Sequence, residues 1–404
     1  MLYRVLYERE AFASSKNTTF LDELSYTDLW FEKTPITLLW MRLSSVPDPR
    51  RAQGRRHDLS LLLTLALLAS CCSWNSYQAM HEWCVEFQNQ IKTHLPFLAG
   101  HTPDASTFHR VFSNLDYEAF EEVIYAWFAE VSPLEAGEGI ALDGKTIGSS
   151  GLHIVASFAH KAKRVLWQRG TDTKGKELVI GPEVLSRIPL MDHIVTGDAM
   201  FTQVKICKQI TESGGGYVFT VKGNQEKLEE DIRIFFESPP WGVLIEINTT
   251  VTRARGRIET RTIEMSQGLN SYLEFPGVTH IWRITRTVKH KGEISQEVSV
   301  GIARLLESFN TASYLNRYIR QHWSIENNLH RARDTLFAED QCPIRKRNGP
   351  YVATTIRNLV IALFHKGHIQ NHKQAMRRFT VHPEQLFVFL GLQFIQQNSK
   401  FMYN

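Results

Sequence analysis

Short apolar strands alternate with helices between residues 139 and 222, and this order constrains the fold more than any other feature of the sequence. Five strands are expected there, at GIALD (139–143), LHIVASFAH (152–160), RVLWQRG (164–170), DHIVTGD (192–198) and YVFTVK (217–222). The second and third form a hairpin, and helices near 177–188 and 202–213 separate the last three. A strand that is reached through a helical crossover pairs in parallel with an earlier one, so the expected fold class is α/β.

Two acids, Asp143 and Asp198, end the first and fourth of these strands. If the fourth strand pairs in parallel with the first, both carboxylates meet at one rim of the sheet, where open α/β sheets place their sites. A third acid, Glu326, lies in a helix expected from Thr311 through Asp334. Each acid alone has an ordinary explanation as a strand cap or a solvated helix residue. Three carboxylates together suit one or two Mg²⁺ or Mn²⁺ ions.

The region before the strands has helical patterns. An apolar stripe runs from Phe120 to Val131 at helical spacing, with Asp116 as its expected N-cap, and another helix begins near Asp104. The apolar stretch Leu59–Cys72 is shorter than the roughly 20 residues that a membrane span needs, so we expect a buried core helix.

Strands and one further helix follow the α/β segment. Residues 240–305 hold four strand-like segments, VLIEINTTVT, RIETRTIEM, HIWRITRTVK and EISQEVSVGI, which indicate an antiparallel insertion. Near the C-terminus, VATTIRNLVIALF predicts an apolar helix that Gly349 and Pro350 open.

The net charge of +4 is an average over opposed regions. Residues 42–57 hold five arginines and one acid, whereas residues 77–138 hold ten acids and two basic residues. This separation indicates a partner that carries phosphates, with a solvated basic face as the alternative. The five cysteines form no CxxC pair, which argues against disulfides and structural zinc and favours a reducing cytoplasm.

Five segments carry a resemblance to a known family. In chain order they are ALDGKTIGSS, TGDAMFTQ, YVFTVKGNQ, GRIETR and HWSIENNLH. They resemble the H-repeat-associated family of bacterial insertion-sequence transposases, which belongs to the DDE superfamily. The upstream segments SVPDPRRAQGRRHDLSLLLTLALLAS and TPDASTFHRVFSNLD resemble the helical N-terminal domain of that family, so the resemblance covers about residues 43–365. It implies that Asp143, Asp198 and Glu326 are the three catalytic acids and that they hold two Mg²⁺ or Mn²⁺ ions.

The resemblance also implies the architecture. We expect a ribonuclease-H-like mixed sheet core with a β-rich insertion and a helical N-terminal domain. The expected divisions are an extension at 1–40, a helical DNA-binding domain at 41–138, a catalytic domain at 139–370 with its insertion at about 240–305, and a tail at 371–404.

The implied function is that of a DNA transposase, which cleaves transposon ends and joins the 3′-OH to target DNA. A metal-dependent endonuclease without strand transfer and a catalytically inactive DNA-binding relic are the alternatives, and a phosphatase-like hydrolase fits the basic clusters poorly. The expected partner is DNA, with a homo-oligomer forming on it. No membrane association is expected, and the expected location is the nucleoid of the bacterial cytoplasm.

Basic residues are expected to contact DNA phosphates. Lys145 and Lys222 lie near the sheet rim, and His322 and Arg333 share a helix with Glu326. For the lysines a solvated side chain is the alternative, and for His322 it is plain helix packing. The remaining candidates form three clusters: Arg50, Arg51, Arg55 and Arg56; Arg253, Arg255 and Arg257; and Arg345, Lys346 and Arg347.

Overall fold

The computed structural model describes residues 36–95, 100–171, 175–254 and 256–392. Helices that precede the sheet in the chain are α2 (Ile36–Leu43), α3 (Leu59–Cys71), α4 (Tyr77–Glu86), α5 (Gln88–His94), α6 (Ala105–Asn114) and α7 (Tyr117–Val131). Every residue of α3 is buried, which confirms the predicted core helix. The side chains of Asp104 and Asp116 accept backbone N–H bonds at the starts of α6 and α7, as N-caps do. No helix in the described ranges has the length and apolar character that a bilayer crossing requires.

The described strands form one nine-stranded mixed sheet. They are β1 (Gly139–Thr146), β2 (His153–Ala159), β3 (Val165–Thr171), β4 (Ile194–Gly197), β5 (Gly216–Val221), β6 (Glu246–Ala254), β7 (Arg257–Ser266), β8 (His280–His290) and β9 (Glu293–Arg304). Their order across the sheet is β3-β2-β1-β4-β5-β9-β8-β7-β6. As predicted, β2 and β3 form an antiparallel hairpin. This hairpin pairs through β2 with one side of β1, and β4 pairs with the other side of β1 in parallel. The mixed sheet confirms the α/β class and is consistent with a ribonuclease-H-like core.

Strand β1 is longer than the sequence predicts. The sequence pattern ends it at Asp143, but the strand continues to Thr146 because its antiparallel pairing with β2 extends to Thr146 and His153. Its parallel pairing with β4 stops earlier, at Leu142 and Gly197. Asp143 is therefore the first residue of β1 after its parallel pairing with β4 ends, and it lies at the predicted rim of the sheet.

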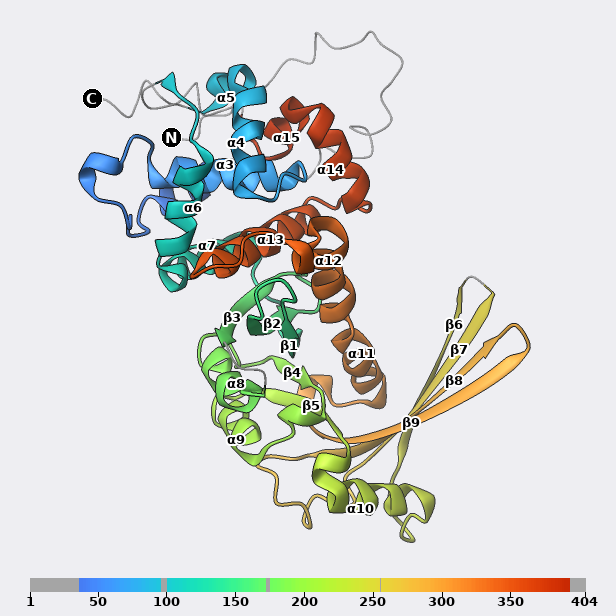
Figure 1. Cartoon of the computed structure of the whole chain (residues 1–404). Helices are drawn as coiled ribbons and strands as arrows, with labels where there is room; N and C mark the ends of the chain where they lie inside the picture. The colour runs from blue at the N-terminus through green and yellow to red at the C-terminus, as the bar shows by residue number, and fades with distance from the viewer. Residues whose placement is uncertain (1–35, 96–99, 172–174, 255, 393–404) are drawn as a thin grey trace, which may run out of the picture.

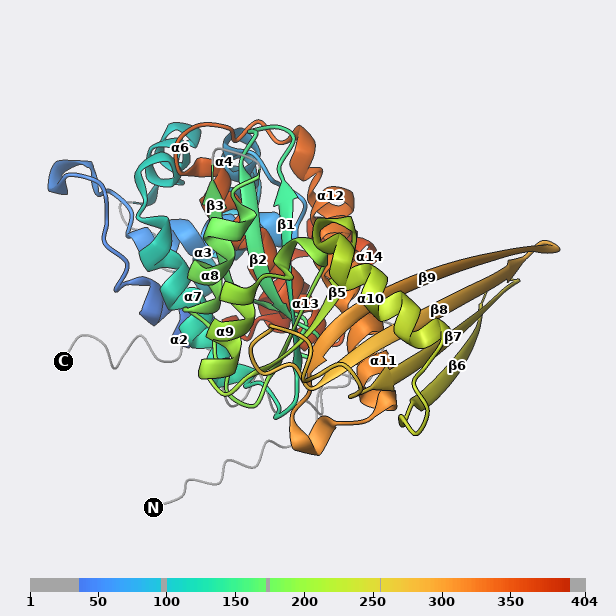
Figure 2. The ribbon, with the colours of Figure 1, turned by 90° about the horizontal axis from the view of Figure 1, so that it is seen from below.

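The predicted antiparallel insertion extends the same sheet. Strand β9 pairs with β5 through its last five residues and with β8 from Glu293 to Ala303, so β6–β9 continue the core strands. Beyond the core these strands project from the molecule as an arm (Figures 1 and 2). Helix α10 (Glu226–Glu237), which the sequence analysis did not predict, packs against β8 and β9 and buries Leu228, Ile232, Phe235 and Phe236.

Other helices complete the described chain: α8 (Glu177–Leu185), α9 (Val204–Glu212), α11 (Ala312–His322), a π-helical turn (Glu326–His330), α12 (Arg331–Phe337), α13 (Gly349–Lys366), α14 (His372–Val381) and α15 (Pro383–Phe389). Short 3₁₀ turns lie at Ala52–Gly54, Ala199–Phe201, Gly223–Gln225, Glu307–Phe309 and Glu339–Gln341. The apolar helix predicted after Pro350 is α13, which packs on α3, α6 and α7. The segment expected as a tail contains α14, packed on α3, and α15, packed on α5.

A buried polar network joins α7, β3 and α13. The carboxyl of Glu121 accepts hydrogen bonds from the Gln168 amide and the Thr355 hydroxyl. The Asn358 amide donates to the side-chain oxygen of Gln168 at 2.9 Å. Burial raises the pKa of Glu121 to about 8, although its hydrogen bonds lower it, so the carboxyl is mostly neutral at pH 7. The network thus fastens the helical region to the edge of the sheet without a buried charge.

Candidate active site

Asp143 and Asp198 come to the same rim through the register of the parallel strands. Leu142 pairs with Gly197, so each aspartate follows a residue of this last parallel pair. Asp198 caps the short turn Ala199–Phe201, where its Oδ1 accepts the Met200 N–H at 3.1 Å. Asp198 is exposed, whereas Asp143 is half-buried.

Helix α11 brings Glu326 over this rim. It packs against β1 and β4, and the His322 ring lies 3.0 Å from the Thr196 hydroxyl of β4. The single helix predicted from Thr311 to Asp334 is in fact interrupted after α11. A π-helical turn starts at Glu326, and its backbone carbonyl accepts the Arg331 N–H. Such turns are frequent at functional sites.

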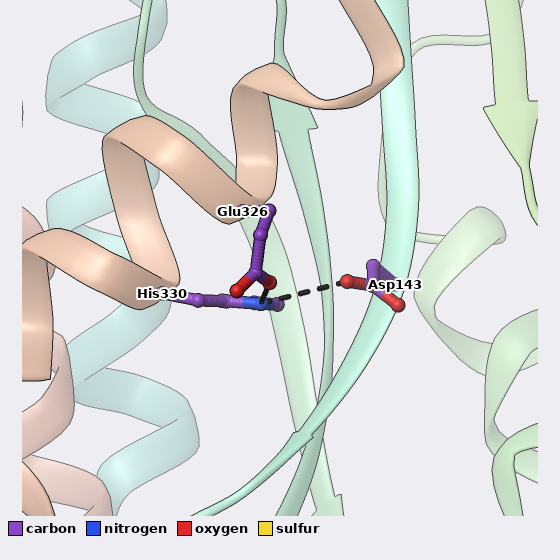
Figure 3. Close-up of side chains that lie close together, drawn as sticks. All are labelled: Asp143, Glu326 and His330. Atoms are coloured by element: carbon purple, nitrogen blue, oxygen red, sulfur yellow. Dashed lines mark hydrogen bonds and ion pairs between the residues drawn. The ribbon is translucent and has the colours of Figure 1, made fainter. Parts of the chain in front are cut away.

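Three side chains converge at this point: Asp143, Glu326 and His330. The His330 Nδ1 lies 3.1 Å from Oε2 of Glu326 and 3.5 Å from Oδ2 of Asp143 (Figure 3). One ligand atom from each residue lies within 4.8 Å of the others. Asp198 is outside this close group.

The electrostatics of the rim disfavour an ionised Asp143. Burial raises its pKa to about 7, and the nearby carboxylates of Asp198 and Glu326 add to this rise, while the Gly144 N–H bond opposes it. The hydrogen bond between His330 and Glu326, by contrast, lowers the pKa of Glu326. Asp198 and Glu326 both contribute to the raised pKa of Asp143, so both carboxylates lie close enough to act on it.

This donor set fits a divalent cation. Two carboxylates face each other at a partly buried rim with a third nearby, so their mutual repulsion is offset when a cation binds between them. Carboxylate oxygens are the ligands that Mg²⁺ and Mn²⁺ prefer. Asp143 and Glu326 would hold the ion.

Comparison with known proteins identifies the family. The model of the transposase DDE domain matches residues 132–363, and the model of the domain associated with it matches residues 40–128. The chain belongs to the transposase DDE domain family. This confirms the family resemblance drawn from the five segments.

Similar proteins include two that are named as putative transposases. This DDE protein is 29% identical to "Putative transposase YncI" of Escherichia coli O157:H7, over 85% of this chain and 93% of that protein. It is 29% identical to "H repeat-associated putative transposase YhhI" of E. coli K12, over 80% of this chain and 89% of that protein. An uncharacterised protein encoded in the dhlA 3′ region of Xanthobacter autotrophicus is 34% identical, over 62% of this chain and 89% of that protein.

Most of the basic residues predicted to contact DNA are exposed on the DDE protein. These are Arg51, Arg55, Arg56, Lys222, Arg253, Arg345, Lys346 and Arg347. Arg257 is half-buried and forms an ion pair with Glu259 at 2.7 Å. Arg255 lies outside the described residues.

Four of the residues predicted to contact DNA have partners within the protein. Arg333 is 0% exposed and pairs with Glu339, so the prediction that it faces DNA is wrong in this structure. Arg50 is mostly buried, where it pairs with Asp48 and donates to a backbone carbonyl. His322 contacts Thr196, as the packing alternative predicted. Lys145 forms an ion pair with Asp334.

His330 is not among the site residues predicted from the sequence, although its spacing from Glu326 was a signal for it. His330 follows Glu326 by four residues, which places both side chains on one helical face. The prediction considered His322, four residues on the other side of Glu326. Helix spacing places both histidines one turn from Glu326. The packing of α11 on β4 directs His322 to Thr196, whereas His330 lies beside Glu326.

Proposed function

We propose that the protein is an active transposase, which cleaves the ends of an insertion sequence and joins the freed 3′-OH to target DNA. The observation that carries the proposal is the convergence of Asp143 and Glu326 at the sheet rim, where the register of β1 and β4 also places Asp198. Membership of the transposase DDE domain family supports the same reaction.

The three acids hold two Mg²⁺ or Mn²⁺ ions in this proposal. Bound ions of this kind activate the attacking hydroxyl and stabilise the leaving oxygen of a phosphodiester. Asp143 lies on β1 and Glu326 in the turn after α11, and their carboxylates face a common point. Asp198, at the end of β4, supplies the third carboxylate. Strands β1 and β4 belong to the packed core, and the turn follows α11, which packs on both strands, so the backbone positions of the three acids are set before DNA arrives.

DNA is the proposed partner, bound by the exposed basic residues. Arg51, Arg55 and Arg56 lie on the helical region, Arg253 lies on the arm and Lys222 follows β5. Lysine and arginine side chains neutralise phosphates and supply affinity without sequence readout. Assembly into a homo-oligomer on paired ends and a location at the bacterial nucleoid are part of the same proposal.

The first test replaces one rim acid. Asp143→Asn keeps the size of the side chain but removes the charge, so we expect Mg²⁺-dependent cleavage of DNA with the element's own ends to fall by about 10³-fold or more. DNA affinity, measured by gel shift, is expected to stay within about twofold. Asp231→Asn on α10, outside the cluster, is the matched control and is expected to cleave normally.

A strand-transfer assay with pre-cleaved ends separates the proposal from its nearest alternative. Joined product is expected from the wild-type protein and not from Asp143→Asn. Cutting without any joined product would favour an endonuclease, and DNA binding without cutting would favour an inactive relic. Undiminished cleavage by Asp143→Asn would contradict the assignment of the site. The substrate comes from the DNA that flanks the gene, where matching inverted repeats are expected.

A further inference from the structure

We propose that His330 is a metal ligand of this protein, with Nδ1 completing a carboxylate–carboxylate–imidazole site with Asp143 and Glu326. The inference rests on the proposed function, because it adds a nitrogen donor to the cation site of that reaction. Its consequence is a preference for Mn²⁺ over Mg²⁺.

The distances carry the first step. The Nδ1 of His330 lies 3.1 Å from a Glu326 oxygen and 3.5 Å from an Asp143 oxygen. A cation with bonds of about 2.0–2.2 Å joins donor atoms that lie up to roughly 4 Å apart. The nitrogen is therefore as close to the carboxylate oxygens as two ligands of one ion are to each other. Asp198, which the sequence predicted as a ligand, lies outside this close group.

The orientation of the ring carries the second step. The His330 side chain is 4% exposed, and Nδ1 is the atom that faces both carboxylates (Figure 3). Its Nε2 is buried and has no hydrogen-bond partner among the described residues. Because the ring is almost completely buried and its Nε2 makes no hydrogen bond, packing holds the ring in place and directs Nδ1 at the carboxylates.

The backbone around His330 is also fixed. The Lys145 ammonium lies 3.5 Å from the His330 carbonyl oxygen and forms an ion pair with Asp334, one turn further along. Lys145 follows Asp143 on β1 by two residues, so this contact ties the π-helical turn to the strand that carries the first acid. Preorganisation of this kind is typical of residues that hold a bound group.

The chemistry of the donor sets the selectivity. Mg²⁺ prefers oxygen ligands and water, whereas imidazole suits transition metals, among which Mn²⁺ accepts both nitrogen and oxygen donors. Loss of the imidazole should therefore weaken Mn²⁺ binding more than Mg²⁺ binding. A histidine that only positions Glu326 through a hydrogen bond would affect both ions alike.

The decisive experiment uses Mn²⁺ as a spectroscopic probe in the full chain without DNA. With less than one equivalent of Mn²⁺ bound, electron spin-echo envelope modulation is expected to show coupling to ¹⁴N in the wild-type protein. Labelling all histidines with ¹⁵N is expected to replace that coupling with the ¹⁵N pattern, which tests the ligand without a mutation. Absence of nitrogen coupling at a bound Mn²⁺ would overturn the proposal.

Variants assign the signal to His330. His330→Gln is expected to lose the nitrogen coupling and to weaken Mn²⁺ binding by about tenfold or more, with a change of about threefold or less for Mg²⁺. His382→Gln, which replaces an exposed histidine at the start of α15, is the matched control and should retain both coupling and affinity. Coupling that persists in folded His330→Gln would also overturn the proposal.

Asp143→Asn separates failure of this inference from failure of the proposed function. If it abolishes Mn²⁺ binding while His330→Gln keeps wild-type affinity, the carboxylate site stands and only the nitrogen ligand is wrong. If Mn²⁺ binding is unchanged by Asp143→Asn, the cation site of the proposed function is itself wrong.

Discussion

The guanidinium of Arg333 has no exposed surface and lies beside the equally buried carboxylate of Glu339. A second arginine, Arg357 of α13, donates to the same carboxylate at 3.0 Å. Burial alone would raise the pKa of Glu339, but the two arginines hold it below its usual value. A buried charge group of this kind tolerates the loss of a member poorly, because the remaining charges lose their compensation.

Replacement of Arg333 should therefore act on stability. Arg333→Met is expected to lower the free energy of unfolding by about 3 kcal/mol, since it leaves Glu339 with one arginine and removes a buried ion pair. Urea denaturation followed by circular dichroism measures this. Arg331→Gln, an exposed neighbour on α12, is the control and is expected to change stability by about 0.5 kcal/mol or less.

A contrary result is easily recognised. If Arg333→Met kept wild-type stability and lost DNA affinity, the side chain would act on DNA after all.

The sequence prediction for Arg333 failed because a buried arginine needs partners that sequence spacing cannot identify. Glu339 and Arg357 meet it only when α13 packs behind α12.

At the scale of helices and strands, alternation and capping predicted much of the core. The places of β2, β3 and β4 beside β1 follow from the hairpin and the helical crossover, so Asp143 and Asp198 could be placed on one rim. The true end of β1 could not be predicted, because it depends on how far β2 continues beside it. The π-helical turn could not be predicted either, because it is defined by the backbone bond from the Arg331 N–H to the Glu326 carbonyl, which residue spacing does not reveal.

The junction of α7, β3 and α13 gives a pH dependence with a definite sign. The folded-state pKa of Glu121, about 8, lies above its ordinary value of 4.5, so the neutral carboxyl favours the folded state. That contribution is complete below about pH 4.5 and is lost as the pH rises through about 8, because the unfolded chain releases this proton more readily than the folded protein does. Wild-type stability is expected to fall over this range.

Glu121→Gln should remove that fall. Its side-chain oxygen still accepts from Thr355 and Gln168, but it has no charge to acquire in the folded protein. Urea midpoints measured between about pH 5 and 8 are expected to be flatter for this variant than for the wild type. Glu122→Gln, whose carboxylate is exposed and paired with Arg187, is the control. Parallel profiles for Glu121→Gln and wild type would contradict the buried titration.

Across the whole molecule, exposed basic side chains lie on the helical region, at the rim of the sheet and on the arm. The small net charge of +4 conceals this distribution. One basic groove joins segments that are far apart in the sequence: His109, Arg110, Ser113 and Asn114 of α6 with Lys346 and Arg347, around a cavity of about 310 Å³. The Arg347 guanidinium donates to the Asn114 side chain at 3.0 Å, which fixes the groove's shape. The sequence predicted the cluster at 345–347 but not its position beside α6.

The groove makes a quantitative prediction for DNA binding. Lys346 is exposed and has no ion pair among the described residues, so its ammonium is available to a phosphate. Each phosphate contact contributes about 0.9 to the slope of log K against log salt concentration. Lys346→Gln is therefore expected to reduce that slope by about 0.9 in fluorescence-anisotropy titrations.

Two comparisons make this result interpretable. Lys208→Gln on α9 removes a lysine that pairs with Glu212, and it is expected to leave the slope unchanged. Asp143→Asn is also expected to keep the full slope, because the proposed role of the rim acids is in the reaction and that of the groove is in DNA affinity. A slope that is the same for Lys346→Gln and wild type would place the DNA elsewhere on the molecule, on the arm or on the cluster of Arg51, Arg55 and Arg56.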